Sequence, residues 1–472
     1  MIRMLGVLGT IALFACADDD GMINPDAGTD APADTSEPDT GTDATTDTGL
    51  DAGDDAADDA ASDVSADAPV DAPDDATDAT VDVGVDASMP CGAGPACAPD
   101  EMCWGGGCNC IREIDGDSYL RTDGRVVYAS AGMPLAETAP GTPLTNVIEI
   151  MDGWRHTCAL RDDGTVWCWA KNGSAGVNGE IGDGSTATGR TPMLATQVLT
   201  AAATPLTGIA HLSDRTSSRC YIEYTTCAIR GADGAVFCWG GDNAGGGTGS
   251  LFTKGSVGNR PFATQLDAAD GVPLTGIAKV SVGLRHACAI DTDGGVLCWG
   301  MNVGGPLGQG DQVERRYPTV VPLPAGALAD EIGVGGDISC ARSGDTVFCW
   351  GHNNQGGIGY TDDIAGDSDG CINFCRLTPA QVIDDTGAAL SGVRHLEVNY
   401  LGACAIMTDD TLRCWGDGVG PVATEPSFRG APLTGVADLT SCSSNSITTA
   451  INHMGVDATY YRSTFEATPV CP

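Results

Sequence analysis

The sequence predicts an all-β protein, a seven-bladed β-propeller preceded by a signal peptide, a disordered acidic linker and a small disulfide-rich segment. Three observations predict this organisation. A short phrase with two cysteines and a final tryptophan recurs along the chain, an apolar phrase precedes each copy, and residues 1–90 have a very different composition from the rest.

Residues 1–15 are typical of a secretory signal peptide, with Arg3 ahead of an apolar run from Leu5 to Phe14. The last residues of this segment and Cys16 resemble a bacterial lipobox, so we expect cleavage before Cys16 and lipidation of that cysteine. Cleavage nearby as an ordinary signal peptide is the alternative. Either leader exports the chain, and lipidation predicts an outer-membrane or cell-surface lipoprotein of the bacterial cell envelope, with the periplasmic face as a second possibility.

Residues 16–90 form the predicted tether. Between Asp18 and Ser88 the chain has 23 acidic residues and no lysine or arginine. Such a segment cannot bury enough apolar area to offset its ordering entropy, and its charges repel one another, so we expect it to stay extended. It carries 23 of the 41 net negative charges. Because no basic stripe occurs, the sequence argues against nucleic acid as a partner.

Residues 91–110 contain five cysteines among glycine and proline, too short a segment for an apolar core. This composition predicts a small disulfide knot. The odd count requires a partner elsewhere, and Cys220, Cys442 or Cys471 is available.

Residues 111–472 are predicted to fold into the propeller. Two cysteine-free copies of the phrase, 119–128 and 449–462, complete seven units, and the five cysteine-containing copies span 158–169, 227–239, 288–299, 340–350 and 404–415. Each copy predicts a β-hairpin, because an Asp-Gly type turn separates two runs of apolar or β-branched residues. The preceding phrase, such as 143–150 or 273–283, predicts a further strand.

The paired cysteines are predicted to be structural disulfides. In such a hairpin the two cysteines of one copy fall nearly opposite each other on adjacent strands. The predicted pairs are Cys158 with Cys168, Cys227 with Cys238, Cys288 with Cys298, Cys340 with Cys349, and Cys404 with Cys414. A zinc site needs short knuckles and a second ligand pair, and a redox pair normally has a C-x-x-C motif. Cys371 and Cys375 come closer to knuckle spacing, but no histidine lies near them in the sequence.

The pattern H-x-C-A-L-x-x-D-G-x-V-x-C-W-x-x-N, with glycine-rich loops such as 179–185 and 304–311, resembles the regulator of chromosome condensation repeat. The resemblance covers about residues 111–472 and implies a seven-bladed β-propeller. The nucleotide-exchange role of the eukaryotic founder and its chromatin association do not fit an exported, disulfide-rich chain.

The sequence nominates no catalytic nucleophile, no cofactor and no metal site. His156 and His286 stand at the same place in two units, and we expect both to be structural. The tryptophan that follows each second cysteine is expected to pack between blades.

We therefore expect a monomeric, non-enzymatic, membrane-anchored scaffold that binds a protein or glycan through loops around 170–200, 240–270, 301–322 and 351–380. Aromatic residues and arginine are favoured at binding hot spots, and these loops supply Arg315, Arg316, Tyr317, Tyr360, Phe374 and Phe252. The alternative is an exported hydrolase or lyase that acts on polysaccharide in the propeller channel. It requires acids of different blades, such as Asp183, Asp311 and Asp362, to meet around one cleft.

Overall fold

The structure is a computed structural model. It describes residues 102–468 except 105–106, 110, 116–117, 122, 129–133, 154, 172–177, 188–190, 214–223, 243–250, 253–257, 354–355, 361–374, 400–401, 417–418, 426, 429–430, 433–435, 442–446, 453–456 and 462–463. All of these belong to one unit, residues 85–472. The predicted signal peptide, the lipidation site Cys16, the tether and most of the knot lie outside the described residues.

The described residues of this unit include seven antiparallel sheets of three or four strands. The first has three strands, β3 (Ile111–Asp115), β4 (Ser118–Arg121) and β5 (Val126–Tyr128). The next three are β8 (Val147–Asp152), β9 (His156–Arg161), β10 (Val166–Ala170) and β11 (Thr196–Gln197); β14 (Ile209–Leu212), β15 (Thr225–Arg230), β16 (Val236–Gly240) and β17 (Arg260–Gln265); and β20 (Ile277–Val282), β21 (His286–Asp291), β22 (Val296–Gly300) and β23 (Arg315–Val320).

The last three sheets repeat the same order of four strands. They are β24 (Glu331–Val334), β25 (Ile338–Ser343), β26 (Thr346–His352) and β27 (Cys375–Gln381); β28 (Val393–Val398), β29 (Gly402–Met407), β30 (Leu412–Gly416) and β31 (Gly420–Thr424); and β34 (Val436–Ser441), β35 (Ile447–Asn452), β36 (Asp457–Tyr461) and β37 (Thr464–Thr468).

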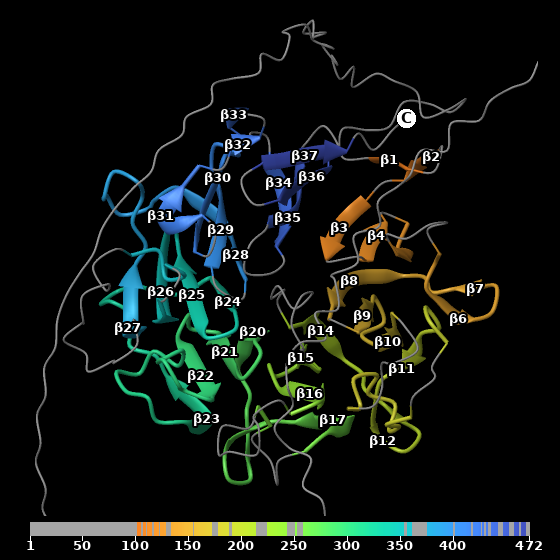
Figure 1. Cartoon of the computed structure of the whole chain (residues 1–472). Helices are drawn as coiled ribbons and strands as arrows, with labels where there is room; N and C mark the ends of the chain where they lie inside the picture. The colour runs from red at the N-terminus through yellow and green to blue at the C-terminus, as the bar shows by residue number, and fades with distance from the viewer. Residues whose placement is uncertain are drawn as a thin grey trace, which may run out of the picture. The chain divides into compact units, whose positions relative to one another are not determined.

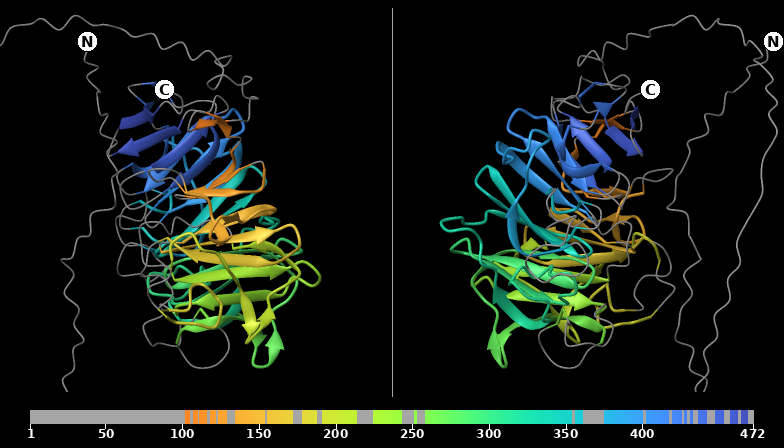
Figure 2. Two further views of the ribbon diagram at one scale, coloured as in Figure 1. Left: turned by 90° about the vertical axis from the view of Figure 1, so that its right-hand side faces the viewer. Right: turned by 60° about the vertical axis from the view of Figure 1, so that its left-hand side comes forward.

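The sheets follow one another around a ring (Figure 1), and two side views show the same succession (Figure 2). Strand β8 contacts both β3 and β14, β24 contacts both β20 and β28, and β28 contacts β34. Strand β34 in turn contacts β3, so the first and last sheets are neighbours. The all-β propeller that the sequence predicts is therefore confirmed.

Short hairpins lie outside the seven sheets. One, β1 (Met102–Trp104) with β2 (Gly107–Asn109), precedes the first sheet. The others join the last strand of one sheet to the first strand of the next. They are β6 (Glu137–Ala139) with β7 (Thr142–Pro143), β12 (Leu199–Ala201) with β13 (Thr204–Pro205), β18 (Asp267–Ala269) with β19 (Val272–Pro273), and β32 (Ser427–Phe428) with β33 (Ala431–Pro432).

The central hairpin of each cysteine-containing sheet keeps one register although its turn varies in length. In the β9–β10 hairpin Gly164 has a φ of 74°, a left-handed conformation that glycine adopts without strain. The shortest turn joins the pair Ser343 and Thr346, and the longest joins Ile229 and Val236. Because the extra residues stay within the turn, the two cysteines of every hairpin remain directly opposite each other.

The structure joins each of these cysteine pairs by a disulfide, with Cα atoms 4.1 Å apart. The five pairs are Cys158–Cys168, Cys227–Cys238, Cys288–Cys298, Cys340–Cys349 and Cys404–Cys414. Cys375, which the sequence places near knuckle spacing, is also disulfide-bonded and so is no metal ligand. Its neighbour Cys371 lies outside the described residues.

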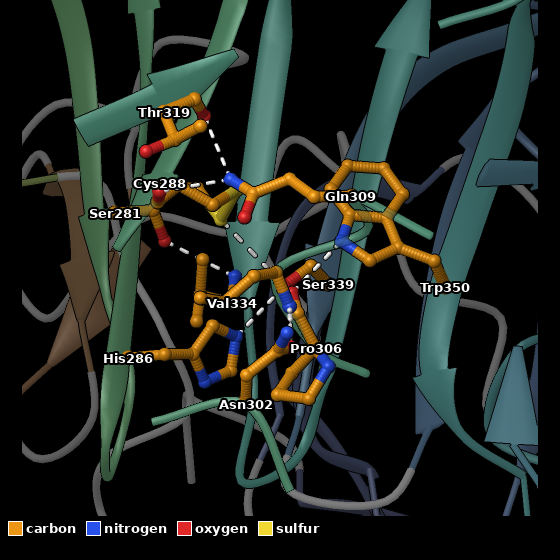
Figure 3. Close-up of a disulfide and its surroundings, with 12 residues drawn as sticks. Ser281, His286, Cys288, Asn302, Pro306, Gln309, Thr319, Val334, Ser339 and Trp350 are labelled. Atoms are coloured by element: carbon orange, nitrogen blue, oxygen red, sulfur yellow. Dashed lines mark hydrogen bonds between the residues drawn. A yellow bond between two sulfur atoms is a disulfide. The ribbon is translucent and has the colours of Figure 1, made fainter. Parts of the chain in front are cut away.

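The apolar core lies between neighbouring sheets, and long loops of three sheets insert into the next interface. The Trp350 indole Nε1 donates to the backbone carbonyl of Pro306 at 2.8 Å, and the Ser339 hydroxyl donates to the same carbonyl at 2.9 Å (Figure 3). The adjacent Leu307 is fully buried in the same cluster as Trp350. Trp239 and Trp299 contact the preceding loops in the same way. The repeated tryptophan therefore wedges between sheets, as expected.

Candidate recognition surface

Strand β23 is the outermost strand of its sheet and carries three of the predicted binding residues. Arg316 and Val320 are exposed, whereas Arg315 and Tyr317 are half-buried. A bulge interrupts the pairing of β23 with β22 between Arg315 and Thr319, so the side chains do not alternate strictly along the strand. The strand exposes Arg316 to solvent, whereas Arg315 faces the preceding loop.

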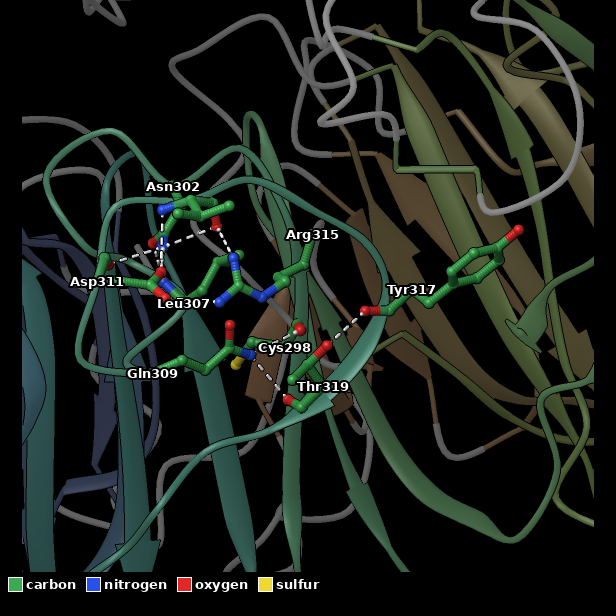
Figure 4. A network of polar contacts seen from close by, with 9 residues as sticks. Cys298, Asn302, Leu307, Gln309, Asp311, Arg315, Tyr317 and Thr319 are labelled. Atoms are coloured by element: carbon green, nitrogen blue, oxygen red, sulfur yellow. Dashed lines mark hydrogen bonds and ion pairs between the residues drawn. The ribbon is translucent and has the colours of Figure 1, made fainter. Parts of the chain in front are cut away.

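Arg315 has a structural role. Its guanidinium donates to the Asp311 carboxylate at 2.7 Å and to the Val313 carbonyl at 2.6 Å (Figure 4). The Asn302 side-chain amide donates to the Asp311 carbonyl at 2.8 Å and to the Val313 carbonyl at 3.1 Å. Burial opposes ionisation of Asp311, but the Val313 N–H and the Arg315 guanidinium outweigh it and lower the pKa of Asp311. These contacts fix the loop between β22 and β23.

Tyr317 and Arg316 form the exposed part of the site. The Tyr317 hydroxyl donates to the Asp270 carboxylate, which belongs to the turn between β18 and β19. This hydrogen bond raises the pKa of the Tyr317 phenol. The Arg316 Cζ lies 5.2 Å from the centroid of the Tyr317 ring, within cation–π range. We call Asp270, Arg316 and Tyr317 the β23 surface.

Phe252 was predicted as an exposed contact, and this prediction is wrong. Its exposed fraction is 1%. It follows Leu251, whose carbonyl accepts a hydrogen bond from the Trp299 indole at 3.0 Å. Phe252 therefore anchors its loop in the next interface, as Leu307 does. The sequence did not indicate this, because residues 240–260 do not share the residue spacing of the loop that contains Leu307.

Two predicted binding residues remain, Tyr360 and Phe374. Tyr360 is half-buried and packs against the core, and the Arg376 Cζ lies 4.7 Å from its ring centroid. Part of the Tyr360 side chain is therefore used in contacts within the propeller. Phe374 lies outside the described residues.

The acids of the hydrolase alternative are held in their own loops. The Asp183 carboxylate accepts a hydrogen bond from the Ser185 N–H at 3.0 Å, and Asp311 is paired with Arg315. The sheet β14–β17 stands between their sheets in the ring. Asp362 lies outside the described residues. Among the described residues no group of three His, Cys, Asp or Glu side chains is arranged to hold a metal ion.

A ring of ionisable residues on the first strand of each of the seven sheets was not predicted from the sequence. The register of these strands places seven residues at one equivalent position, and they are Glu113, Glu149, His211, Lys279, Glu331, His395 and Asp438. The signal was the polar residue two positions after the first apolar residue in the recurring upstream phrase.

Two glutamates of this ring, Glu149 and Glu331, connect neighbouring sheets. The Glu149 carboxylate accepts a hydrogen bond from the Leu212 N–H at 2.9 Å and pairs with His211 at 3.5 Å. Glu331 accepts from the Leu396 N–H at 3.1 Å and pairs with His395 at 2.6 Å. Burial opposes ionisation of Glu331, but His395 and Arg342 outweigh it and lower the pKa of Glu331. The ring therefore satisfies backbone donors at the sheet boundaries.

Within the part of the chain that the structure describes, no helix has the length and apolar character needed to cross a membrane.

A closed succession of antiparallel sheets, built from a repeated hairpin that carries a buried tryptophan in five of the sheets, defines a repeat-built β-propeller. Models of the regulator of chromosome condensation (RCC1) repeat match residues 153–174, 277–305 and 293–342. The matched residues lie in three of the sheets, so the chain contains RCC1 repeats within a β-propeller fold.

Segments of this chain are similar in sequence to known proteins. A segment of 195 residues, 41% of this chain, is 26% identical to the human E3 ubiquitin-protein ligase HERC2 and covers 4% of that protein. A segment of 235 residues, 49% of this chain, is 25% identical to the ultraviolet-B receptor UVR8 of Arabidopsis thaliana and covers 46% of it. The matches therefore span less than half of either relative.

Among solved structures, human WBSCR16 is similar to this chain with a TM-score of 0.50 and 16% sequence identity. The match covers 67% of this chain and 76% of that chain. At this identity the likeness concerns the fold alone.

Proposed function

We propose that this protein is a non-enzymatic recognition scaffold that binds a protein or glycan partner through the β23 surface. RCC1-repeat propellers commonly mediate protein binding. The observation that carries the proposal is the exposed Arg316 above the Tyr317 ring, whose hydroxyl is bonded to Asp270. Arginine and tyrosine are enriched at binding hot spots.

The sheet behind this surface supports the proposal because it is rigid. Strand β23 pairs with β22, whose Cys298 forms a disulfide with Cys288. The Gln309 amide donates to the backbone carbonyls of Cys298 and Thr319 at 3.2 and 2.9 Å. A preorganised surface loses little conformational entropy when a partner binds.

The location of the scaffold is part of the same proposal. The leader and Cys16 support export and lipid attachment, and the acidic tether would hold the propeller away from the membrane as an extended chain. The lipoprotein would then display the β23 surface in the bacterial cell envelope, as a monomer, at the outer membrane or cell surface. Metabolic labelling with a fatty acid analogue, in the natural chain and in Cys16→Ser, tests the attachment.

A capture experiment tests the recognition role. The full oxidised chain is immobilised and exposed to envelope and extracellular fractions, and crosslinked molecules are identified by mass spectrometry. The double variant Arg316→Ala/Tyr317→Ala is expected to weaken capture by about 2 kcal/mol, about thirtyfold in Kd, with an unchanged melting temperature.

The matched control is Arg125→Ala, which removes a partly exposed arginine from the turn before β5 of the first sheet. It is expected to retain the same partner as the natural chain. Equal capture by the double variant would remove the β23 surface from the proposal. If no molecule is retained but a polysaccharide of the fraction is shortened, the hydrolase or lyase alternative moves ahead.

A further inference from the structure

Asp152 and Lys171 form an ion pair that is almost completely removed from water. The Lys171 Nζ contacts the Asp152 Oδ2, with 5% of the lysine side chain and none of the aspartate side chain exposed. Asp152 is the last residue of β8, and Lys171 directly follows β10 of the same sheet. Lysine and aspartate are seldom buried to this extent.

Burial makes the charged state of this pair costly. Transfer of each ion from water into the interior carries a penalty of several kcal/mol, only partly recovered by their mutual attraction. The neighbouring His156 adds no charge, because burial, with the Lys171 ammonium as a second cause, lowers its pKa to about 3. A reaction that turned the ion pair into one neutral group would remove both desolvation penalties.

The two oxygens of the Asp152 carboxylate have different partners. The Ser118 and Thr157 hydroxyls donate to Oδ1 at 2.9 and 2.5 Å, whereas Oδ2 faces the Lys171 amine. Donors on Oδ1 are placed to stabilise the negative charge that develops there when a nitrogen adds to the carboxyl carbon. The carboxylate of Asp115, which is 4% exposed, lies alongside, with its Oδ2 2.8 Å from the Asp152 backbone nitrogen.

We propose that Asp152 and Lys171 condense to an intramolecular isopeptide bond. The Lys171 Nζ forms a bond to the Asp152 Cγ, and the bond between Cγ and Oδ2 breaks. Two of the three ammonium protons leave with Oδ2 as water, and the third stays on the amide nitrogen. The reaction is a condensation, so no oxidant, reductant or co-reactant is needed. The protons pass directly from Nζ to Oδ2, which contact each other, and the Asp115 carboxylate positions Asp152 by accepting its backbone N–H.

This crosslink has a structural consequence at the first interface of the ring. The first sheet has no disulfide in its hairpin, because Ser118 and Tyr128 stand opposite each other where other sheets have cysteines. The Ser118 hydroxyl instead contacts Asp152 of the next sheet. An amide between Asp152 and Lys171 fixes the residue that holds the two sheets together, and reductants do not break it.

Peptide mapping of the full natural chain tests the proposal. After reduction and alkylation, trypsin cleaves beside Arg125, Arg155, Arg161 and Arg190, but not after an acylated Lys171. Condensation therefore yields peptides 126–155 and 162–190 joined in one species, lighter than their sum by the mass of one water. Recovery of peptides 126–155, 162–171 and 172–190 as separate species, without the joined form, overturns the proposal.

Two variants sharpen the result. Lys171→Arg retains the positive charge but cannot form this amide, so it must yield peptide 126–155 alone, and a joined form in this variant would refute the assignment to Lys171. Asp115→Ala removes the acceptor of the Asp152 N–H and is expected to lower the condensed fraction of the chain. Complete condensation in folded Asp115→Ala would overturn the positioning role of Asp115.

Discussion

His156 and Thr226 are 70 residues apart and meet across the boundary between two sheets, where the His156 Nε2 lies 2.7 Å from the Thr226 Oγ1. The same contact joins His286 to Ser339 at 2.7 Å (Figure 3). Because the Ser339 hydroxyl donates to the Pro306 carbonyl, the His286 Nε2 must carry the proton in that contact. Both imidazoles are buried, so they are structural, as the sequence analysis expected.

The first prediction concerns pH. Burial is the main cause that lowers the pKa of both His156 and His286 from 6.5 to about 3. The unfolded chain then binds more protons than the folded chain between pH 6.5 and 3, so stability is fully present above pH 6.5 and is lost as the pH falls. Each histidine contributes a loss of about 1.4 kcal/mol per pH unit within that window.

Urea denaturation at several pH values measures this slope. In His156→Gln/His286→Gln the slope of the unfolding free energy against pH is expected to fall by about twice that amount, because both histidines are removed. Carboxylates such as Glu331, whose pKa is lowered in the folded chain, also lose stability in acid and leave a residual slope in the variant. An unchanged slope would contradict the assignment.

The second prediction concerns the hydroxyl partner. Thr226→Val keeps the shape of the side chain but leaves the His156 Nε2 without its contact, which is expected to cost about 1–3 kcal/mol of unfolding free energy. Thr226→Ser retains the hydroxyl and is the matched control. Chemical denaturation compares the two, and equal stability of the valine and serine variants would show that the contact contributes nothing.

The third prediction concerns the disulfides. Cys288→Ala/Cys298→Ala opens a crosslink between residues ten apart in sequence and is expected to lower the free energy of unfolding by about 2–3 kcal/mol, mainly through the unfolded state. Guanidinium denaturation measures the loss. Reduction of the natural chain opens all five hairpins and must lower stability further than the double variant does.

The fourth prediction concerns the loop anchor that the sequence analysis placed on the surface. Phe252→Ala is expected to cost about 3–5 kcal/mol, because it leaves a cavity beside Trp299 in the same apolar cluster. Val320→Ala is the control, since 67% of Val320 is exposed and its truncation should change stability by less than about 0.5 kcal/mol. Thermal unfolding distinguishes them, and a small effect at Phe252 would return it to the surface.

The fifth prediction concerns the sheet edges. The outermost strands β17, β23, β27 and β31 each contain a proline, namely Pro261, Pro318, Pro379 and Pro421. Proline has no N–H to offer to another strand, so these edges resist pairing between molecules. Pro318→Val is expected to self-associate in sedimentation experiments where the natural chain stays monomeric. Thr319→Val is the control on the same strand. It adds an apolar group but introduces no new backbone N–H, so this variant should stay monomeric.

The local sequence pattern determined the hairpins, the disulfide pairs and the repetition of the sheets. The hairpin, its turn and the opposition of its two cysteines depend on residues about ten apart, so the sequence alone indicated each pair and the repeat of whole sheets. The wedged tryptophan followed from the same repetition, because a side chain fixed at one place in every unit meets the same neighbour around a ring.

Tertiary structure decided which side chains meet between sheets. Phe252 and Arg316 both lie in segments that the sequence predicts to be loops, yet Phe252 is buried in the next interface and Arg316 is exposed on strand β23. The Asp152–Lys171 pair and the His156–Thr226 contact join residues whose spacing carries no periodic signal. Such contacts depend on how far each loop folds back and how neighbouring sheets are rotated, quantities set by the packing of the whole ring and not by any local run of residues.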